Sequence, residues 1–198
     1  MLSIVSEGIT VELNPETLII IENATEAEYE RLANEDLKLD FDGERIYIHS
    51  PATARHEMIT LSILILCKNY FDANPEKGLP LGSRFAIRLP SGKRTEPDTV
   101  VIPAHAVAPE MSQFNGIPTL VVEILSPSTR DHDLTKKKTW YMENQVPEIF
   151  YMDLEGEIAT FFFLTANGTY EQESASTGVI ASRIFEGLEF PVGDLLNI

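Results

Sequence analysis

Two carboxylates in apolar, strand-like surroundings are the residues best suited to chemistry. Glu123 lies inside the apolar run TLVVEIL, and Asp98 follows a proline and opens a second run rich in β-branched residues. A carboxylate in a strand buried on both faces is costly unless it meets a metal ion, a cation or several hydrogen-bond donors. If the two strands are neighbours, both carboxylates converge at one edge of the sheet. Hard oxygen ligands with open coordination positions suit Mg²⁺ or Mn²⁺.

A helix expected over 131–144 supplies a third candidate, a lysine. Spacings of four residues place Lys137 on one helical face with Asp133 and Tyr141. Lys137 is the middle of three consecutive lysines, which point about 100° apart, so at most one or two of them can face the sheet.

Each candidate has a structural alternative. Asp98 could cap a turn. Glu123 could be a core carboxylate that an arginine such as Arg84 or Arg94 neutralises. The acid–lysine pair on the helix could be exposed and worth only ~0.2–0.5 kcal/mol. The four histidines show no ligand spacing and are expected to be structural or surface residues: His49, His56, His105 and His132.

The elements that must position these groups follow from periodicity and turn signals. A capping box at Thr25 and Glu28 predicts a short amphipathic helix ending near Asn34. Two apolar stripes predict a long helix over 53–71. Alternation, β-branched runs and turn dipeptides predict strands over 37–41, 45–49, 84–89, 98–102, 119–125, 148–153, 158–164 and 170–173. This order predicts an α/β fold with a mixed central β-sheet flanked by helices.

The chain length favours one domain over residues 1–198. Within it we expect a peripheral N-terminal portion over 1–50, containing a hairpin and a helix. A core over 51–155 follows, and then a C-terminal hairpin and tail over 156–198.

Charge is the unusual feature of the composition. The chain has 15 Lys+Arg against 31 Asp+Glu, a net charge of −16, which argues against a protein that coats nucleic acid. Segment 84–138 nevertheless holds eight basic and six acidic residues, 8 − 6 = +2, so the acidic surplus lies away from the candidate site. The lone Cys67 and the lack of an apolar run of about 20 residues predict a cytoplasmic protein without a membrane span.

The candidate residues lie in blocks that resemble a known family. A PD pair, the block VVEILSPST, then Asp133, Lys137 and Tyr141 at fixed offsets and VPEIFYMD resemble the Uma-two family of restriction-endonuclease-like proteins. That family is assigned to the PD-(D/E)XK nuclease superfamily. The resemblance covers roughly residues 32–153 and implies a restriction-endonuclease-like core.

Site roles are also implied by the resemblance. Asp98, Glu123 and the main-chain carbonyl of Ile124 would bind Mg²⁺ or Mn²⁺, and Lys137 would complete a catalytic set with the two acids. The superfamily's usual lysine position is Leu125 here, and the matching lysine comes from the following helix. The superfamily often adds an acid from its first helix, where Glu57 is the candidate here. Many relatives also have a glutamate three residues before the DG of the hairpin; that position is Leu39 here, with Asp40 beside it.

The function implied is that of a metal-dependent endonuclease that hydrolyses phosphodiester bonds. Its partner would be nucleic acid, with DNA as the expected substrate, and a homodimer would suit cleavage of both strands. The alternative is a nuclease-fold module that binds nucleic acid or mediates assembly without turnover, which Leu125 at the usual lysine position favours.

Overall fold

A computed structural model describes residues 2–6, 9–13, 17–33, 37–82, 84–108 and 110–198. Its largest feature is a mixed six-stranded sheet in the order β14-β13-β12-β11-β9-β6. Strands β11 and β12 are parallel, and the other pairs in this sheet are antiparallel. The bounds are β6 Leu79–Gly82, β9 Thr99–Ile102, β11 Leu120–Leu125, β12 Glu148–Asp153, β13 Ile158–Leu164 and β14 Tyr170–Ala175.

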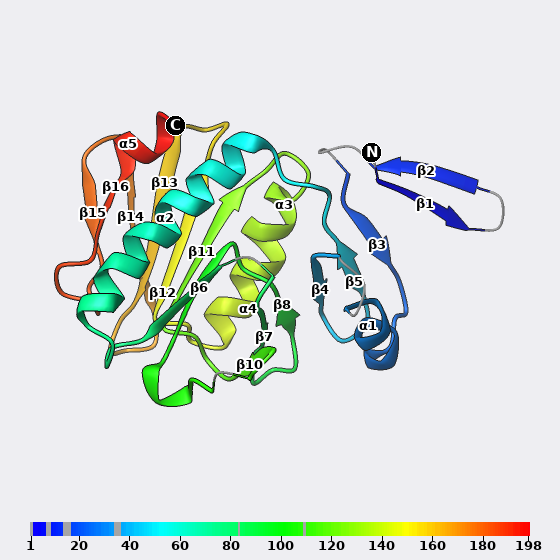
Figure 1. Ribbon diagram of the computed structural model, residues 1–198, viewed down its shortest axis with the longest axis horizontal. Helices are drawn as coiled ribbons and strands as arrows, with labels where there is room; N and C mark the ends of the chain where they lie inside the picture. Colours follow the sequence, from blue (N-terminus) through cyan, green and yellow to red (C-terminus); the bar gives the residue numbers. More distant parts are fainter. Residues whose placement is uncertain (1, 7–8, 14–16, 34–36, 83, 109) are drawn as a thin grey trace.

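A second six-stranded sheet, in the order β10-β7-β8-β4-β5-β3, packs beside the first (Figure 1). Its strands are only two or three residues long: β3 Ile19–Ile21, β4 Leu39–Phe41, β5 Ile46–Ile48, β7 Ala86–Arg88, β8 Arg94–Thr95 and β10 Gln113–Asn115. Two hairpins complete the strands: β1 Leu2–Ser6 with β2 Ile9–Leu13, and β15 Val179–Ala181 with β16 Glu189–Pro191.

Helices lie on both faces of the central sheet, except for the first helix of the chain, which packs against the second sheet (Figure 1). Their bounds are α1 Glu26–Ala33, α2 Ala54–Ala73, α3 Arg130–His132, α4 Lys138–Glu143 and α5 Val192–Leu196, with a 3₁₀ turn at Ala104–Ala106. Successive side chains of a strand point to opposite faces. Accordingly, Val122 and Ile124 of β11 pack with α2, whereas Val121 and Leu125 lie with Trp140 of α4.

Several local expectations are confirmed. The capping box forms, because Thr25 N–H donates to Glu28 Oε2 at 2.8 Å and Glu28 N–H donates to Thr25 Oγ1 at 3.3 Å. The hairpin β4–β5 pairs as expected, and α2 begins after its N-cap Thr53. The buried strands β9, β11 and β12 and the hairpin β13–β14 lie where the patterns placed them.

Other expectations need correction. The helix expected over 131–144 is interrupted by a π-helical segment, Asp133–Lys137, between α3 and α4. The strand expected over 84–89 covers only 86–88, since Arg84 adopts a left-handed conformation with φ 79°. Strands β6, β8, β10, β15 and β16 were not expected. All five are only two to four residues long, too short to show an alternating pattern in the sequence.

Glu148, at the start of β12, is a buried acceptor that fixes the C-terminal segment. It accepts hydrogen bonds from Ser182 Oγ at 2.7 Å and from the N–H groups of Arg183 at 2.6 Å and Ile184 at 3.1 Å. We expect Glu148→Ala to lower the free energy of unfolding by about 2–3 kcal/mol, because these donors lose their acceptor. Urea unfolding measures the change. The exposed Glu173→Ala is the control, and equal losses in the two variants would contradict this role.

Candidate active site

The two acids predicted to converge lie on neighbouring strands. Strands β9 and β11 are antiparallel, with Val122 opposite Thr99, and continuing this register by one residue places Glu123 opposite Asp98. Both acids have the parity of the residues that face α4, such as Val121 on β11. The sheet thus presents both carboxylates on one face, at the end of the paired segment.

Asp98 is held by three donors. Its Oδ1 lies 2.6 Å from Lys38 Nζ, and its Oδ2 accepts the Ile124 N–H at 2.8 Å and lies 3.2 Å from His56 Nε2. Burial opposes ionisation of this carboxyl, but the charges of Lys38 and His56 outweigh it and hold the pKa of Asp98 well below its usual range. The alternative that Asp98 merely caps a turn is wrong.

Glu123 meets an ion-pair partner and a hydrogen-bond donor at one oxygen. Its Oε1 lies 2.6 Å from Lys137 Nζ and accepts the Tyr141 hydroxyl at 2.5 Å. Burial raises the pKa of Glu123 to about 7, and the nearby carboxylates of Asp133 and Asp98 add to this rise. The ammonium of Lys137 opposes it. The carboxyl therefore gains a proton more readily than an exposed glutamate does.

The alternative that an arginine neutralises Glu123 is wrong. Arg84 Nε lies 3.3 Å from Glu96, and Arg94 forms ion pairs with Glu26 of α1. Arg88 also pairs with Glu26, at 3.2 Å, so part of the positive charge of segment 84–138 is compensated by α1.

Lys137 is fully enclosed, with 0% of its side chain exposed, so the alternative of an exposed helical pair is also wrong. Besides Glu123, its Nζ lies 3.5 Å from Asp133 Oδ1 and 3.9 Å from Asp40 Oδ2. Burial disfavours the charged lysine, but Asp40 and Glu123 outweigh it and hold its pKa well above the usual range. The π-helical segment carries both Asp133 and Lys137, and such segments occur often at functional sites.

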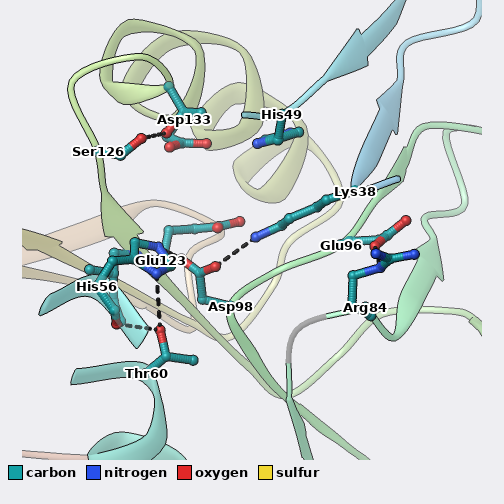
Figure 2. A network of polar contacts seen from close by, with 12 residues as sticks. Lys38, His49, His56, Thr60, Arg84, Glu96, Asp98, Glu123, Ser126 and Asp133 are labelled. Carbon is teal, nitrogen blue, oxygen red and sulfur yellow. Dashed lines mark hydrogen bonds and ion pairs between the residues drawn. The ribbon is translucent and has the colours of Figure 1, made fainter. Parts of the chain in front are cut away.

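Most of the side chains that the second sheet contributes beside Asp98 and Glu123 were not identified from the sequence. Lys38, just before β4, extends into the site toward Asp98 (Figure 2). Asp40 is fully buried, with its Oδ2 2.7 Å from His49 Nε2 and 3.0 Å from His132 Nε2. Burial lowers the pKa of His49, despite its acidic neighbour Asp40.

Three of the four histidines, which the sequence suggests are structural or surface residues, hydrogen-bond to buried acids at this place. His49 and His132 meet Asp40, and His56 meets Asp98, whereas His105 is exposed on the 3₁₀ turn. Two of these contacts, His56–Asp98 and His132–Asp40, join residues 42 and 92 positions apart, which no local spacing signals. Glu57 does not lie among the buried acids: its side chain is 62% exposed, its carboxylate lies 3.8 Å from the His56 ring, and it lines the wider of the two hollows beside the site.

Two adjoining hollows give access to the acids. The inner one, about 40 Å³, is lined by residues that include Glu123, Ile124 and Lys137. The outer one, about 450 Å³, is lined by residues that include Arg84. Lys38 and Asp98 line both. Among the buried acids and lysines of the site, Asp98 and Lys38 are thus the two that also line the outer hollow.

The donor set fits a divalent cation. Four carboxylates (Asp40, Asp98, Glu123 and Asp133) lie with two ammonium groups (Lys38 and Lys137), so acids outnumber lysines here. Asp133 Oδ1 is buried and makes no hydrogen bond. Within a strand the N–H and C=O of one residue point to the same side, so the Ile124 carbonyl faces the side of Asp98. These are hard oxygen donors, the type that Mg²⁺ and Mn²⁺ prefer.

Comparison with known proteins gives a family match and a structural match. The profile of the family Uma2, described as "Putative restriction endonuclease", matches residues 26–193. A solved structure from Anabaena variabilis, titled a "putative nuclease belonging to DUF820", superposes with a TM-score of 0.73 and 16% identity, covering 88% of this chain and 98% of that one. The chain thus has the restriction-endonuclease-like fold that the sequence patterns predict. Curated proteins give no match. Among the described residues, no helix is long and apolar enough to cross a membrane.

Proposed function

The chain belongs to the Uma2 family of restriction-endonuclease-like proteins, and from this membership we propose that it is a divalent-metal-dependent endonuclease. The observation that carries the proposal is the convergence of Asp98 and Glu123 on one hollow, with a lysine ammonium 2.6 Å from each carboxylate. An acid pair with lysines beside it has the groups that phosphodiester hydrolysis needs.

The proposed metal ligands are Asp98, Glu123 and the main-chain carbonyl of Ile124, with Mg²⁺ or Mn²⁺ as the ion. A divalent cation held there supplies Lewis-acid polarisation of a phosphate oxygen and activation of a water nucleophile. Tyr141 aids by donating to Glu123, which fixes the orientation of that carboxylate. His56 and the Ile124 N–H fix Asp98 in the same way.

The two lysines have different positions, and we assign them different parts. Lys38 lies at the mouth, with its side chain 19% exposed and facing both hollows, so its ammonium is placed to meet a phosphate from the groove. Lys137 is enclosed behind Glu123 and holds positive charge against the negative charge that develops on the phosphate. An ion that takes Asp98 as a ligand would free Lys38 for the substrate.

A nuclease assay tests the proposal. The purified protein is incubated with plasmid DNA, linear duplex DNA, single-stranded DNA and RNA, each with Mn²⁺, with Mg²⁺ or with a chelator. We expect cleavage of DNA in either ion and none with the chelator. Absence of cleavage on every substrate, with the protein folded, would contradict the enzymatic function.

The alternative is a module that binds nucleic acid without cutting it. Two observations favour it: Leu125, at the usual lysine position, packs in the apolar cluster with 2% exposure, and Lys137 does not line the outer hollow.

Binding of a divalent metal ion distinguishes the endonuclease from the non-cleaving module. We expect Mn²⁺ to raise the Tm of the wild-type protein, because an ion bound only to the folded state stabilises it by about 2.7 kcal/mol at 100 times Kd.

The matched control for this shift is Asp98→Asn, which removes one ligand charge and should lose the Mn²⁺-induced rise in Tm. Differential scanning fluorimetry at several ion concentrations measures both proteins. A wild-type Tm that does not respond to Mn²⁺ or Mg²⁺ would favour the module.

Lys38→Met tests the substrate-facing lysine. We expect the cleavage rate to fall by about 10²-fold, the effect of removing one charge-stabilising donor, while the Mn²⁺-induced rise in Tm persists. The control is Lys68→Met, since Lys68 is exposed on α2 and pairs with Asp72 away from the site. A Lys38→Met enzyme with wild-type cleavage would show that this ammonium does not meet the phosphate.

We further propose that the partner of the protein is nucleic acid and that its substrate is DNA. We also propose a homodimer, which would bring one active site to each DNA strand. Sedimentation velocity of the free protein tests the dimer. A cytoplasmic location fits Cys67, which is free and buried, because a reducing compartment keeps such a thiol unpaired.

A further inference from the structure

We propose that Asp40, His49 and His132 form a second metal site, which takes a transition-metal ion such as Zn²⁺ or Co²⁺. The Nε2 atoms of both imidazoles are directed at one oxygen, Asp40 Oδ2, at 2.7 Å and 3.0 Å. One ligand atom from each of the three residues lies within 4.8 Å of the others, and all three residues are buried. The site adjoins the acid pair but shares none of the ligands proposed there, and it does not depend on the proposed nuclease activity.

Three different elements hold these ligands in place. Asp40 is the middle residue of β4, and its Oδ1 accepts the Glu96 N–H at 3.2 Å, which leaves Oδ2 for the cluster. His49 follows β5, and its N–H donates to the Lys38 carbonyl at 3.0 Å. His132 belongs to α3, where its ring packs on Tyr47 with centroids 4.1 Å apart. The ligands are therefore arranged before any ion binds.

The spacing suits a small tetrahedral ion. Ligands about 2.0–2.1 Å from a zinc ion in tetrahedral geometry lie roughly 3.3 Å from one another. The observed separations of 2.7 Å and 3.0 Å from Asp40 Oδ2 to the two rings are slightly shorter, so small outward shifts make room for an ion. Each imidazole then carries its proton on Nδ1 and offers the Nε2 lone pair to the ion. Three protein ligands leave a fourth position for water.

The ligand types separate this site from the oxygen site. Imidazole favours Zn²⁺, Co²⁺ and related ions, whereas Mg²⁺ prefers oxygen donors. An ion can reach the site from either hollow, because His49 lines both of them. Lys137 Nζ lies 3.9 Å from Asp40 but closer to Glu123 and Asp133, so these two carboxylates retain the ammonium when an ion takes Asp40.

Visible absorption spectroscopy with Co²⁺ tests the proposal, because tetrahedral Co²⁺ has an intense ligand-field spectrum. The chelator-treated full-length protein is titrated with CoCl₂, and circular dichroism confirms that each variant is folded. We expect one equivalent of tetrahedral Co²⁺ in the wild type and its loss in His49→Gln. The matched control is His56→Gln, another buried histidine beside a carboxylate, which should keep the spectrum.

The variant Asp98→Asn should also keep the Co²⁺ spectrum, because it alters only the oxygen site. Its retention together with loss in a folded His49→Gln protein supports the proposal, whether or not the protein cleaves DNA. A folded wild-type protein without a tetrahedral spectrum would overturn it. So would a spectrum that survives His49→Gln, or one lost in Asp98→Asn or His56→Gln, since the ion would then lie at Asp98.

Discussion

Asp98→Asn is expected to lower the single-turnover rate of metal-dependent DNA cleavage by about 10³-fold, since losing even one charge-stabilising donor costs 10²–10³-fold in enzymes. The substitution keeps the size of the side chain but removes the negative charge that a divalent cation needs. It also leaves Lys38 without its partner at 2.6 Å. Single-turnover cleavage of end-labelled duplex DNA, with enzyme in excess and saturating Mn²⁺, measures the rate.

A matched control is Asp131→Asn, which removes an exposed acid from α3, close in sequence to the site but outside the hollow. This variant should cleave at the wild-type rate. Identical purification of all three proteins shows whether a contaminating nuclease is present, because a contaminant would cut equally in every preparation. Cleavage by Asp98→Asn within a factor of a few of the wild type would remove this acid from the catalytic set.

Lys137→Met is expected to lower the free energy of unfolding by about 3–5 kcal/mol, the range for removing one partner of a buried ion pair. Methionine has a similar length but no charge. Its introduction leaves Glu123, Asp133 and Asp40 as a buried group of acids without their shared cation. Urea unfolding followed by circular dichroism measures the loss.

The neighbouring Lys136→Met is the control, since Lys136 is exposed on the same segment and should lose less than about 0.5 kcal/mol. Lys137→Arg keeps the charge and should recover part of the stability. If Lys137→Met unfolds at the same urea concentration as Lys136→Met, the buried ammonium does not hold these acids together. Cleavage by a folded Lys137→Met protein at the wild-type rate would separately exclude Lys137 from the reaction.

The central sheet could be predicted because its strands are long and buried on both faces. Runs such as 119–125 contain almost no polar residue, so Glu123 stands out, and a proline marks the start of the strand beside Asp98. The closeness of the Asp98 and Glu123 carboxylates then follows from one assumption, that the two strands are neighbours. The antiparallel pairing of β9 and β11 confirms that assumption. Helical spacing likewise places Lys137 and Tyr141 on one face, and both contact Glu123.

The rest of the site could not be predicted, because a second sheet supplies it. Alternation over 37–41 predicts Asp40 on the polar side of its strand, whereas all three residues of β4, Leu39–Phe41, are buried in the structure. Asp40 and His132 are 92 residues apart and meet only through the packing of β4 against α3. Lys38 and Asp98 are 60 residues apart. Such contacts leave no periodic trace in a single sequence.

The π-helical segment shows a different limit. Residues 131–144 have the composition of an ordinary helix, and nothing in their order marks the wider turn at Asp133–Lys137. Its consequence is visible only in three dimensions. The Asp133 carboxylate and the Lys137 ammonium both lie in the inner hollow, where Asp133 Oδ1 is left without a hydrogen bond beside the other acids.

The central claim is that Asp98, Glu123 and the Ile124 carbonyl hold the ion on which cleavage depends. Anomalous diffraction from crystals of the wild-type protein grown with Mn²⁺ tests it most directly. We predict a strong anomalous peak within metal–oxygen bonding distance of both carboxylates. Lys38 Nζ should then have moved away from its position 2.6 Å from Asp98. Crystals that contain Mn²⁺ but show no peak at these carboxylates, with the Lys38–Asp98 pair intact, would contradict the account.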